Sequence, residues 1–158
     1  MTITLGNRTE ETVRIYFQKT NQALFRKVLP QKAKSEAEAV EDYHKTLLPG
    51  ATSYGRTILA DGLYVGDVWC YCIDPNDTPN AMISYCIIEP ELWGRGIAAE
   101  GMRLFLKEIE EKFPIESVGA FTFSENTASI RVLEKNGFDI MEEFVEAGVQ
   151  SQYFERAL

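Results

Sequence analysis

Two closely spaced glycines, Gly94 and Gly96, stand where an apolar, strand-like run gives way to a helical pattern. Glycine lets the backbone come close to a ligand because it has no Cβ atom. The first turn of a helix offers free N–H groups and the positive end of the helix dipole. The Trp93–Ala98 segment therefore has the residue types of an anion site suited to phosphate. The same two glycines would also serve tight packing between a strand and a helix.

A second segment, Asn126–Phe138, begins with polar and small residues and continues with helical spacing. Asn126 is a favourable N-cap residue, and Ser129 lies one turn further along the same helix face. Gly137 occupies a position typical of a helix C-cap. We expect a short helix over 126–136 whose first turn carries Asn126 and Ser129.

The cysteines and the single histidine form no metal-binding pattern. Cys70, Cys72 and Cys86 lie in apolar, strand-like runs, where cysteine usually behaves as a small buried hydrophobe. Because His44 is the only histidine, no zinc-type spacing exists, and no histidine is placed to activate Cys86 as a nucleophile. The odd number of cysteines argues against a disulfide framework. We expect no metal and a reducing, cytoplasmic location.

The charge of the chain limits its partners. Its 158 residues carry a formal net charge of −8, with 16 Lys and Arg against 24 Asp and Glu. Nucleic-acid and anionic-membrane surfaces draw on clustered Lys and Arg, so neither partner is expected. A negative field attracts a cationic substrate such as an amine, although solubility alone explains the same charge. No apolar run approaches the roughly 20 residues of a membrane span, and the N-terminus lacks the features of a signal peptide.

The elements that must position these segments follow from periodicity and turn residues. The pattern predicts one α/β domain over residues 1–158, of the α+β type, in the order β-α-α-β-β-β-α-β-α-β-β. About four helices would flank a mixed, mostly antiparallel sheet of six to seven strands. Asp61-Gly62 is a strong hairpin signal, and Ser35 with Glu38 is typical of a capping box. Strands are expected over 2–5, 56–60, 63–73, 81–88, 118–123, 138–145 and 149–155, and helices over 9–19, 21–29, 35–48, 98–112 and 126–136.

Taken together, these segments resemble the acetyl-CoA motifs of the GNAT N-acetyltransferase superfamily, in the branch that includes ribosomal-protein alanine and spermidine N-acetyltransferases. The first segment is similar to the family's Q/R-x-x-G-x-G/A loop, with Trp93 in the Q/R place and Ala98 in the last glycine place. Asn126–Phe138 is similar to its N-x-x-S…E-K-x-G-F segment, and Leu63–Val68 to its third strand. The resemblance covers roughly the last two thirds of the chain, and the first 55 residues match only in arrangement.

The resemblance implies the GNAT fold and the transfer of an acetyl group from acetyl-CoA to a primary amine, by direct attack in a ternary complex. The fourth strand would end in a bulge and splay from the fifth, and acetyl-CoA would lie in the gap. A backbone N–H near Ile87 would stabilise the negative charge that develops on the thioester oxygen. The residues implied in cofactor binding are Cys86, Ile87 and Ile88 along the strand edge, Trp93, Gly94, Arg95, Gly96, Ile97 and Ala98 in the loop, and Asn126.

The resemblance leaves the proton transfers less defined. Many relatives carry a tyrosine seven positions after the asparagine, which protonates the departing CoA thiolate, and Leu133 stands there in this chain. The implied substitutes are Ser129 or a water molecule. The amine must also lose a proton before it attacks. Glu89, next to the splayed strand end, is the first candidate for this base, ahead of Glu91, Glu125 and His44.

Other functions stay open at this point. A CoA-binding module without enzymatic activity would explain the leucine at position 133, and a protein-interaction domain would need no cofactor. The pattern Gly94-x-Gly96-x-x-Ala99 also fits a dinucleotide-binding Rossmann fingerprint loosely, but that fold needs parallel βαβ units around the loop. The acceptor amine is undefined, with protein N-termini, polyamines and other small amines all compatible, and a homodimer is possible.

Overall fold

The computed structural model describes residues 1–158 except 27–28, 30–32 and 77–78. Its elements follow the predicted order, in which the helical piece expected over 21–29 appears as a third helix before the second strand, and a 3₁₀-helix is added after the fourth strand. They are β1 (Ile3–Gly6), α1 (Glu10–Thr20), α2 (Ala23–Arg26), α3 (Glu36–Lys45), β2 (Tyr54–Ala60), β3 (Leu63–Asp74), β4 (Asn80–Ile87), the 3₁₀-helix η1 (Pro90–Leu92), α4 (Ile97–Lys112), β5 (Ser117–Phe123), α5 (Thr127–Lys135), β6 (Asp139–Glu146) and β7 (Val149–Ala157). Helix α2 lies within the helix predicted over 21–29, and residues 27–28 of that range lie outside the described residues.

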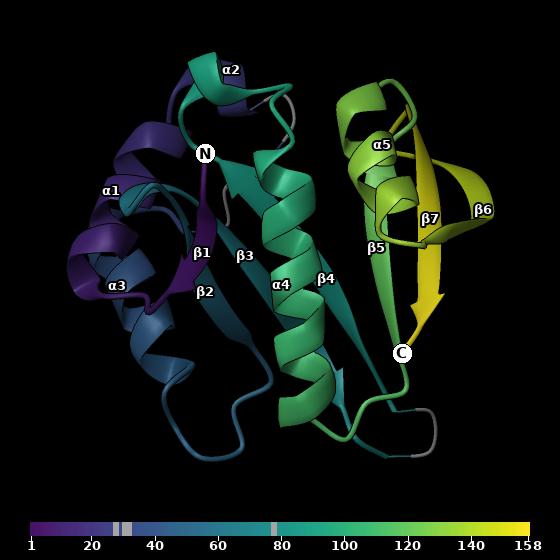
Figure 1. The fold of residues 1–158 in the computed structure, drawn as a ribbon, viewed down its shortest axis with the longest axis horizontal. Helices are drawn as coiled ribbons and strands as arrows, with labels where there is room; N and C mark the ends of the chain where they lie inside the picture. Colours follow the sequence, from purple (N-terminus) through teal and green to yellow (C-terminus); the bar gives the residue numbers. More distant parts are fainter. Residues whose placement is uncertain (27–28, 30–32, 77–78) are drawn as a thin grey trace.

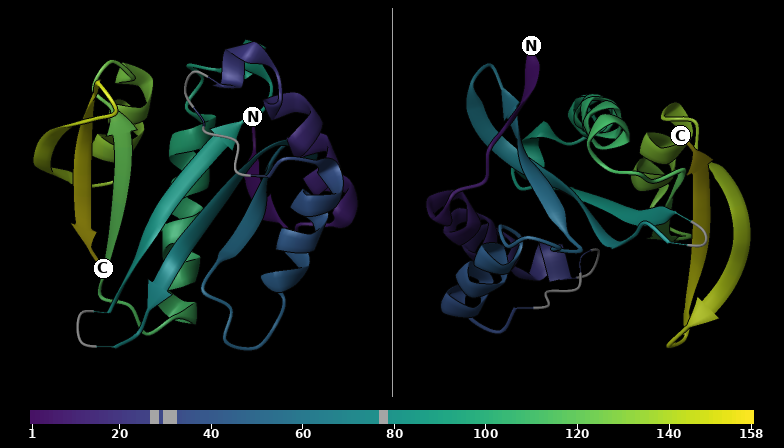
Figure 2. Two further views of the ribbon diagram at one scale, coloured as in Figure 1. Left: turned by 180° about the vertical axis from the view of Figure 1, so that it is seen from behind. Right: turned by 90° about the horizontal axis from the view of Figure 1, so that it is seen from below.

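The seven strands form one mixed sheet in the order β1-β2-β3-β4-β5-β7-β6 (Figure 1). Neighbouring strands are antiparallel except β4 and β5, which are parallel and joined through α4. Their ladder is short, because only Asn80–Met82 pairs with Ser117–Gly119. Figure 2 shows β4 and β5 diverging beyond this ladder. The predicted divergence of the two strands is therefore present. Among the described residues, β4 has no strand partner on its β5 side from Ile83 to Ile87, and this gap between β4 and β5 is called here the splay.

Two groups of helices cover the two faces of the sheet (Figure 2, right). Helices α4 and α5 lie on one face, over the main apolar core, which includes Ile83 and Ile87 of β4. Helices α1 and α2 lie on the other face, where a smaller apolar cluster contains Cys86 and Ile88. Successive β4 side chains thus alternate between the two faces, as a strand requires.

Local turn and cap chemistry explains most element boundaries. Asp61 and Gly62 both have positive φ, at 50° and 81°, as a two-residue type I′ hairpin turn requires. The Ser35 hydroxyl accepts a hydrogen bond from the Glu38 N–H at 3.1 Å, which is the first half of the predicted capping box. The reciprocal box occurs instead at the start of α1, between Thr9 and Thr12.

One prediction about the cysteines is wrong. Cys70 and Cys86 are buried, but Cys72 is exposed. Cys72 has a φ of +51°, and the register between β3 and β4 shifts between Tyr71 and Asp74. This irregularity turns the Cys72 side chain out of the core, so Cys70 and Cys72 do not share a buried face.

Candidate active site

The glycines of the Trp93–Ala98 segment, called here the phosphate loop, are required by backbone conformation. Gly94 and Gly96 have φ values of 77° and 80°, in the left-handed region that favours glycine. A Cβ atom on either would meet no other atom within 4 Å, so both face open space. Gly96 is the N-cap of the 16-residue helix α4, whose first-turn N–H groups point out of the helix end. A pyrophosphate fits this arrangement by charge and by access.

The other residues of the phosphate loop either anchor it to the core or stay exposed. Ile97 is buried in the main core and Ala98 packs against it, so these two residues hold the loop to the sheet. Arg95 is exposed, which leaves its charge available to a phosphate. The backbone N–H groups and the exposed Arg95 side chain therefore lie at the same end of α4.

A hollow of about 320 Å³ adjoins the phosphate loop between the start of α4 and the end of α5. It is lined by Gly96, Ala99, Glu100, Arg103, Lys135 and Asn136. The Arg103 guanidinium donates two hydrogen bonds to Glu100, at 2.9 and 2.6 Å, and this contact lowers the pKa of the Glu100 carboxyl. Arg103 and Lys135 bring two cations to this hollow, and Glu100 offsets part of their charge.

Asn136, the C-cap of α5, fixes the two helices that frame this hollow. Its side chain is 7% exposed. The Nδ2 atom donates to the carbonyl oxygens of Ala99, at 3.1 Å, and Val132, at 3.0 Å. Because Ala99 belongs to the first turn of α4, this buried amide ties the anion-binding end of α4 to α5.

The open edge of β4 presents the backbone of Ile87. A Cβ atom on Gly66 of β3 would clash with the Cys86 carbonyl oxygen, so this carbonyl points toward β3. The N–H of the same peptide belongs to Ile87 and points the opposite way, to the side that β5 leaves free. The Ile88 N–H donates to the Val65 carbonyl of β3 at 2.9 Å. The Ile87 N–H and carbonyl therefore both face the splay.

This register narrows the set of β4 residues, Cys86, Ile87 and Ile88, that the resemblance implies in cofactor binding along the strand edge. Cys86 and Ile88 direct these backbone groups at β3, and their side chains lie on the α1 and α2 face. Ile87 alone of the three presents its backbone to the splay. The bulge that the resemblance implies at the end of β4 is not found there, since the pairing of β3 with β4 is unbroken from Met82 to Ile87. The splay arises instead from the short ladder between β4 and β5.

Trp93 connects the phosphate loop to this edge. Its indole Nε1 donates a hydrogen bond to the Ile87 carbonyl oxygen at 2.9 Å. Its ring meets Phe25 of α2 edge-on, with 5.7 Å between centroids. The Ile87 carbonyl has a second lone pair, so the bond does not exclude a ligand N–H. Trp93 thus sets the spacing between the two ends of the cofactor site.

We expect Trp93→Phe to raise the dissociation constant of acetyl-CoA about fivefold, because the substitution keeps a ring against Phe25 but loses a hydrogen bond that contributes about 1 kcal/mol. Isothermal titration calorimetry measures this change. Trp69→Phe is the matched control, since Trp69 belongs to β3 and meets Tyr16 of α1 edge-on, at 6.0 Å between centroids, rather than the phosphate loop. An equal loss of affinity in both variants would contradict a specific role for Trp93.

Asn126 and Ser129 occupy the first turn of α5, as predicted. The Asn126 Oδ1 accepts a hydrogen bond from the Ser129 N–H at 3.2 Å, so Asn126 is the N-cap. Burial raises the pKa of Tyr85 of β4, and an interaction with the Ser129 side chain opposes this effect. Leu133 is 2% exposed and belongs to the main core. The first turn of α5 therefore carries both residues that the second sequence segment singled out.

The four candidate bases are widely distributed. Glu89 follows β4 directly, and its carboxylate pairs with Lys19 Nζ of α1 at 3.1 Å. His44 Nε2 contacts Glu10 Oε1 at 2.7 Å, between α3 and α1, which is a helix–helix contact. Glu91 and Glu125 are exposed. Only Glu89 is both continuous with the open edge and held in place by a partner.

A buried polar cluster on the α1 face was not anticipated. Asp67 of β3 is 3% exposed. Its carboxylate pairs with Arg8 Nε at 3.3 Å and accepts a hydrogen bond from the Tyr64 hydroxyl at 2.7 Å. Burial raises the pKa of Asp67, and Arg8 opposes this effect. An aspartate at alternating spacing in an apolar strand was the signal in the sequence, but its partner lies 59 residues away.

Cys86 does not have the environment of a nucleophile. Burial raises the pKa of its thiol to about 12, so the reactive thiolate is scarce at neutral pH. Across the described ranges, no group of three His, Cys, Asp or Glu side chains is placed to hold a metal ion. In the same residues, no helix has the length and apolarity to cross a bilayer.

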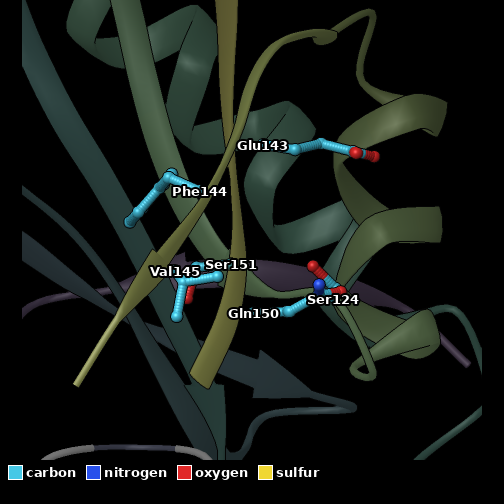
Figure 3. Close-up of a pocket in the computed structure, with 6 residues that line it drawn as sticks. All are labelled: Ser124, Glu143, Phe144, Val145, Gln150 and Ser151. Atoms are coloured by element: carbon cyan, nitrogen blue, oxygen red, sulfur yellow. The ribbon is translucent and has the colours of Figure 1, made fainter. Parts of the chain in front are cut away.

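A second, smaller hollow of about 120 Å³ lies at the β6–β7 hairpin (Figure 3). It is lined by Ser124, Glu143, Phe144, Val145, Gln150 and Ser151. Figure 3 shows the Glu143 and Phe144 side chains pointing to opposite sides of β6. None of these residues belongs to the phosphate loop or the open β4 edge, so this hollow is separate from the cofactor site.

A glycine-opened helix start beside an open strand edge defines a protein that binds an extended ligand with an anionic end, as acyl-CoA is. The family model described as acetyltransferase (GNAT) domain matches residues 4–139, and the chain belongs to this family. It is an acetyl-CoA-dependent N-acetyltransferase. The GNAT fold and the acetyl-CoA co-substrate are thereby confirmed.

Solved structures agree with the fold at low identity. Spermidine N-acetyltransferase from Vibrio cholerae in complex with CoA and spermine is 17% identical, with 98% of this chain and 95% of that chain covered and a TM-score of 0.86. The ribosomal L7/L12 alpha-N-protein acetyltransferase RimL in complex with coenzyme A is 21% identical, with 100% and 95% covered and a TM-score of 0.84. Aminoglycoside acetyltransferase AAC(6')-Ib in complex with coenzyme A is 15% identical, with 99% and 95% covered and a TM-score of 0.81. No curated protein matches the sequence significantly.

Proposed function

We propose that this N-acetyltransferase acts on a cationic primary amine, either a small polyamine-like molecule or a protein N-terminus, by direct attack in a ternary complex. The observation that carries the proposal is the Ile87 N–H, which faces the splay a short distance from the phosphate loop. The net charge of −8 favours a cationic acceptor. The spermidine and ribosomal-protein acetyltransferases named above act on amines of these kinds.

In this proposal the backbone amides of Gly94 to Ala98 hold the pyrophosphate, and Arg95 adds a positive charge. The Ile87 N–H donates to the thioester carbonyl and stabilises the oxyanion that develops there during attack. Asn126 orients the first turn of α5 toward the cofactor, and Ser129 takes part in protonating the departing sulfur. Direct transfer is supported by the raised thiol pKa of Cys86, since a covalent acyl-cysteine would need its thiolate.

The first experiment measures release of free CoA thiol from acetyl-CoA with a panel of polyamines, aminoglycosides and peptides with free N-termini. Acceptor-dependent release with a cationic amine supports the proposal. A protein that binds acetyl-CoA but releases no thiol with any amine would instead be the CoA-binding module considered above. A stable acetyl-enzyme trapped without acceptor would overturn direct transfer.

We propose Glu89 as the group that takes the proton from the acceptor ammonium, with Lys19 holding its carboxylate beside the open edge. Glu89→Gln is expected to lower kcat/KM for the amine about 100-fold, the usual scale of general base catalysis. The effect should shrink at high pH, where free amine is abundant. Glu91→Gln removes an exposed carboxylate two residues away and is the control. Equal rates for both variants at neutral pH would exclude Glu89 as the base.

The domain organisation, location and partners of the protein are proposed from sheet topology, cysteine content and charge. We propose that residues 1–158 form one acetyltransferase domain, because strands from both ends of the chain belong to one sheet. The three free cysteines favour the reducing cytoplasm. We propose no nucleic-acid or membrane partner, and a homodimer is compatible with the exposed edge strand β6. Size-exclusion chromatography with light scattering gives the oligomeric state.

A further inference from the structure

The surface of β5, β7 and β6 that points away from α4 and α5 combines aromatic rings with carboxylates. Ala120 and Phe154 face the main core, so their strand neighbours Phe121 and Tyr153 face the other way. Phe121 is 57% exposed. Its ring centroid lies 4.9 Å from that of Tyr153 and 5.8 Å from that of Phe144. The three rings come from three adjacent strands and form a continuous apolar surface.

Carboxylates border these rings. In the strand register Glu142 of β6 is directly opposite Tyr153, and Asp139 is directly opposite Glu155 of β7, so each pair shares a face. The Tyr153 hydroxyl donates a hydrogen bond to Glu155 at 2.9 Å, which joins the two pairs on one face. The only Lys or Arg in the sequences of β5, β6 and β7 is Arg156, which alternates with Glu155 and faces the other side. The aromatic–acidic face, as it is called here, consists of Phe121, Phe144, Tyr153, Asp139, Glu142 and Glu155.

The aromatic–acidic face borders the splay. Phe121 lies two residues beyond Gly119, the last β5 residue that pairs with β4. Because Gly119 pairs with Met82, the alternation along both strands places Phe121 on the same side of the sheet as Cys86. Cys86 belongs to the apolar cluster under α1 and α2, and the proposed base Glu89 pairs with a lysine of α1. An amine that loses its proton to Glu89 therefore approaches the splay from the side on which the aromatic–acidic face lies.

Rings and carboxylates on one surface suit an organic cation. Ammonium groups are attracted to ring faces and to carboxylates, and methylene groups gain by covering apolar surface. The backbone groups of β7 are paired with β5 on one side and with β6 on the other. A peptide lying flat on this face would therefore find no backbone partners for its amides. A linear polyamine has only ammonium and methylene groups, so it fits the face without leaving such groups unpaired.

We propose that the aromatic–acidic face binds the second ammonium group of a linear diamine or polyamine whose first amine reacts in the splay. The assignment rests on the acetyl transfer proposed above and narrows its acceptor. Glu142 lies two strand spacings from β5, on the order of 10 Å. The acceptor therefore carries its second charge about this far from the reacting nitrogen, with its methylene groups on the three rings between them.

Binding is measured without acetyl transfer. Isothermal titration calorimetry of the CoA-saturated protein compares octamethylenediamine with the amino alcohol in which a hydroxyl replaces one of its amines. The two molecules have the same length, and only the diamine carries a second charge. We expect the diamine to bind about tenfold more tightly, with a smaller advantage at high salt, which screens exposed charges. Equal dissociation constants at low salt would overturn the proposal.

Glu142→Gln and Glu143→Gln form a matched pair of variants. Figure 3 shows Glu143 pointing to the opposite side of β6 from Phe144, and the Glu143 carboxylate accepts a hydrogen bond from Gln152. Glu142→Gln is expected to raise the dissociation constant of octamethylenediamine about threefold. The double variant Phe121→Leu/Glu142→Gln should raise it about tenfold and change binding of the amino alcohol little. Equal effects of Glu142→Gln and Glu143→Gln would contradict the assignment.

Turnover separates this assignment from the proposed function. If thiol release occurs with equal kcat/KM for the diamine and the amino alcohol, the aromatic–acidic face does not select the acceptor and acetyl transfer stands. If no amine releases thiol, the proposed function is contradicted, and the calorimetric comparison still decides what the face binds. The proposal is also overturned if the Phe121 and Glu142 substitutions weaken binding of a peptide with a free N-terminus and leave the diamine unaffected.

Discussion

Gly96→Val is expected to raise the dissociation constant of acetyl-CoA at least 100-fold. A β-branched residue strongly disfavours the φ of +80° at Gly96, so the chain must rearrange at the N-cap of α4. Such a rearrangement turns the first N–H groups of the helix away from the pyrophosphate. Calorimetric titration with acetyl-CoA and with free CoA measures the loss.

Gly50→Val provides a matched control for this substitution. Gly50 follows α3, has a φ of +76° and, like Gly96, would have no atom within 4 Å of a Cβ atom. Both variants should lose about 1–2 kcal/mol of unfolding free energy through backbone strain. Only Gly96→Val should lose the ligand. If Gly96→Val binds acetyl-CoA as the wild type does, the loop backbone does not hold the pyrophosphate.

Arg8→Met is expected to lower the free energy of unfolding by about 3 kcal/mol at pH 8, because it leaves the buried Asp67 carboxylate without its cation. Methionine keeps apolar contact with Trp69, over whose ring the Arg8 guanidinium lies at 5.7 Å. Urea denaturation at several pH values measures the change. The loss should be smaller at pH 5 than at pH 8.

The sign of this pH dependence follows from the direction of the Asp67 shift. Burial already raises the pKa of Asp67 above that of the unfolded chain, and removal of Arg8 raises it further. The folded state then binds a proton more tightly than the unfolded state, so stability falls as pH rises through the folded pKa. Arg14→Met is the control, since Arg14 pairs with Glu10 and Glu36 on the surface and such pairs contribute little. A loss at pH 5 equal to that at pH 8 would contradict this account.

Much of the fold was predictable because its signals are local. The Asp61-Gly62 turn and the Asn126 cap each act within a few residues, and the observed element bounds differ from the predicted ones by one or two residues at most sites. The phosphate loop was predictable for the same reason, since glycines and a helix start are enough to describe it. The Cys72 irregularity carried no local signal, because its cause is the pairing of two strands.

The side-chain arrangement of the site depends on contacts between distant parts of the chain. Lys19 meets Glu89 across 70 residues, and Asn136 donates to the Ala99 carbonyl oxygen across 37. Neither contact can be predicted from the spacing of the residues in the sequence. The choice of Ile87 as the residue that faces the splay depends on the register of β4 against β3, which Gly66 reveals only when the strands are placed together. The resemblance pointed to the β4 edge near Ile87, and the strand register shows that Ile87 is the residue whose backbone faces the splay.

The three-residue ladder between β4 and β5 also has a mechanical meaning. It divides the sheet into two parts, β1–β4 and β5–β7. Between these parts the strands pair only along this short ladder, and helices α4 and α5 with the Asn136 amide also connect them. In the proposed binding mode, a cofactor between β4 and β5 contacts both parts of the sheet with its own polar groups, so its binding energy also holds the two parts together. At a hundredfold excess over its dissociation constant, such a ligand adds about 2.7 kcal/mol to the stability of the fold. In that binding mode the cofactor stabilises the sheet as well as supplying the acetyl group.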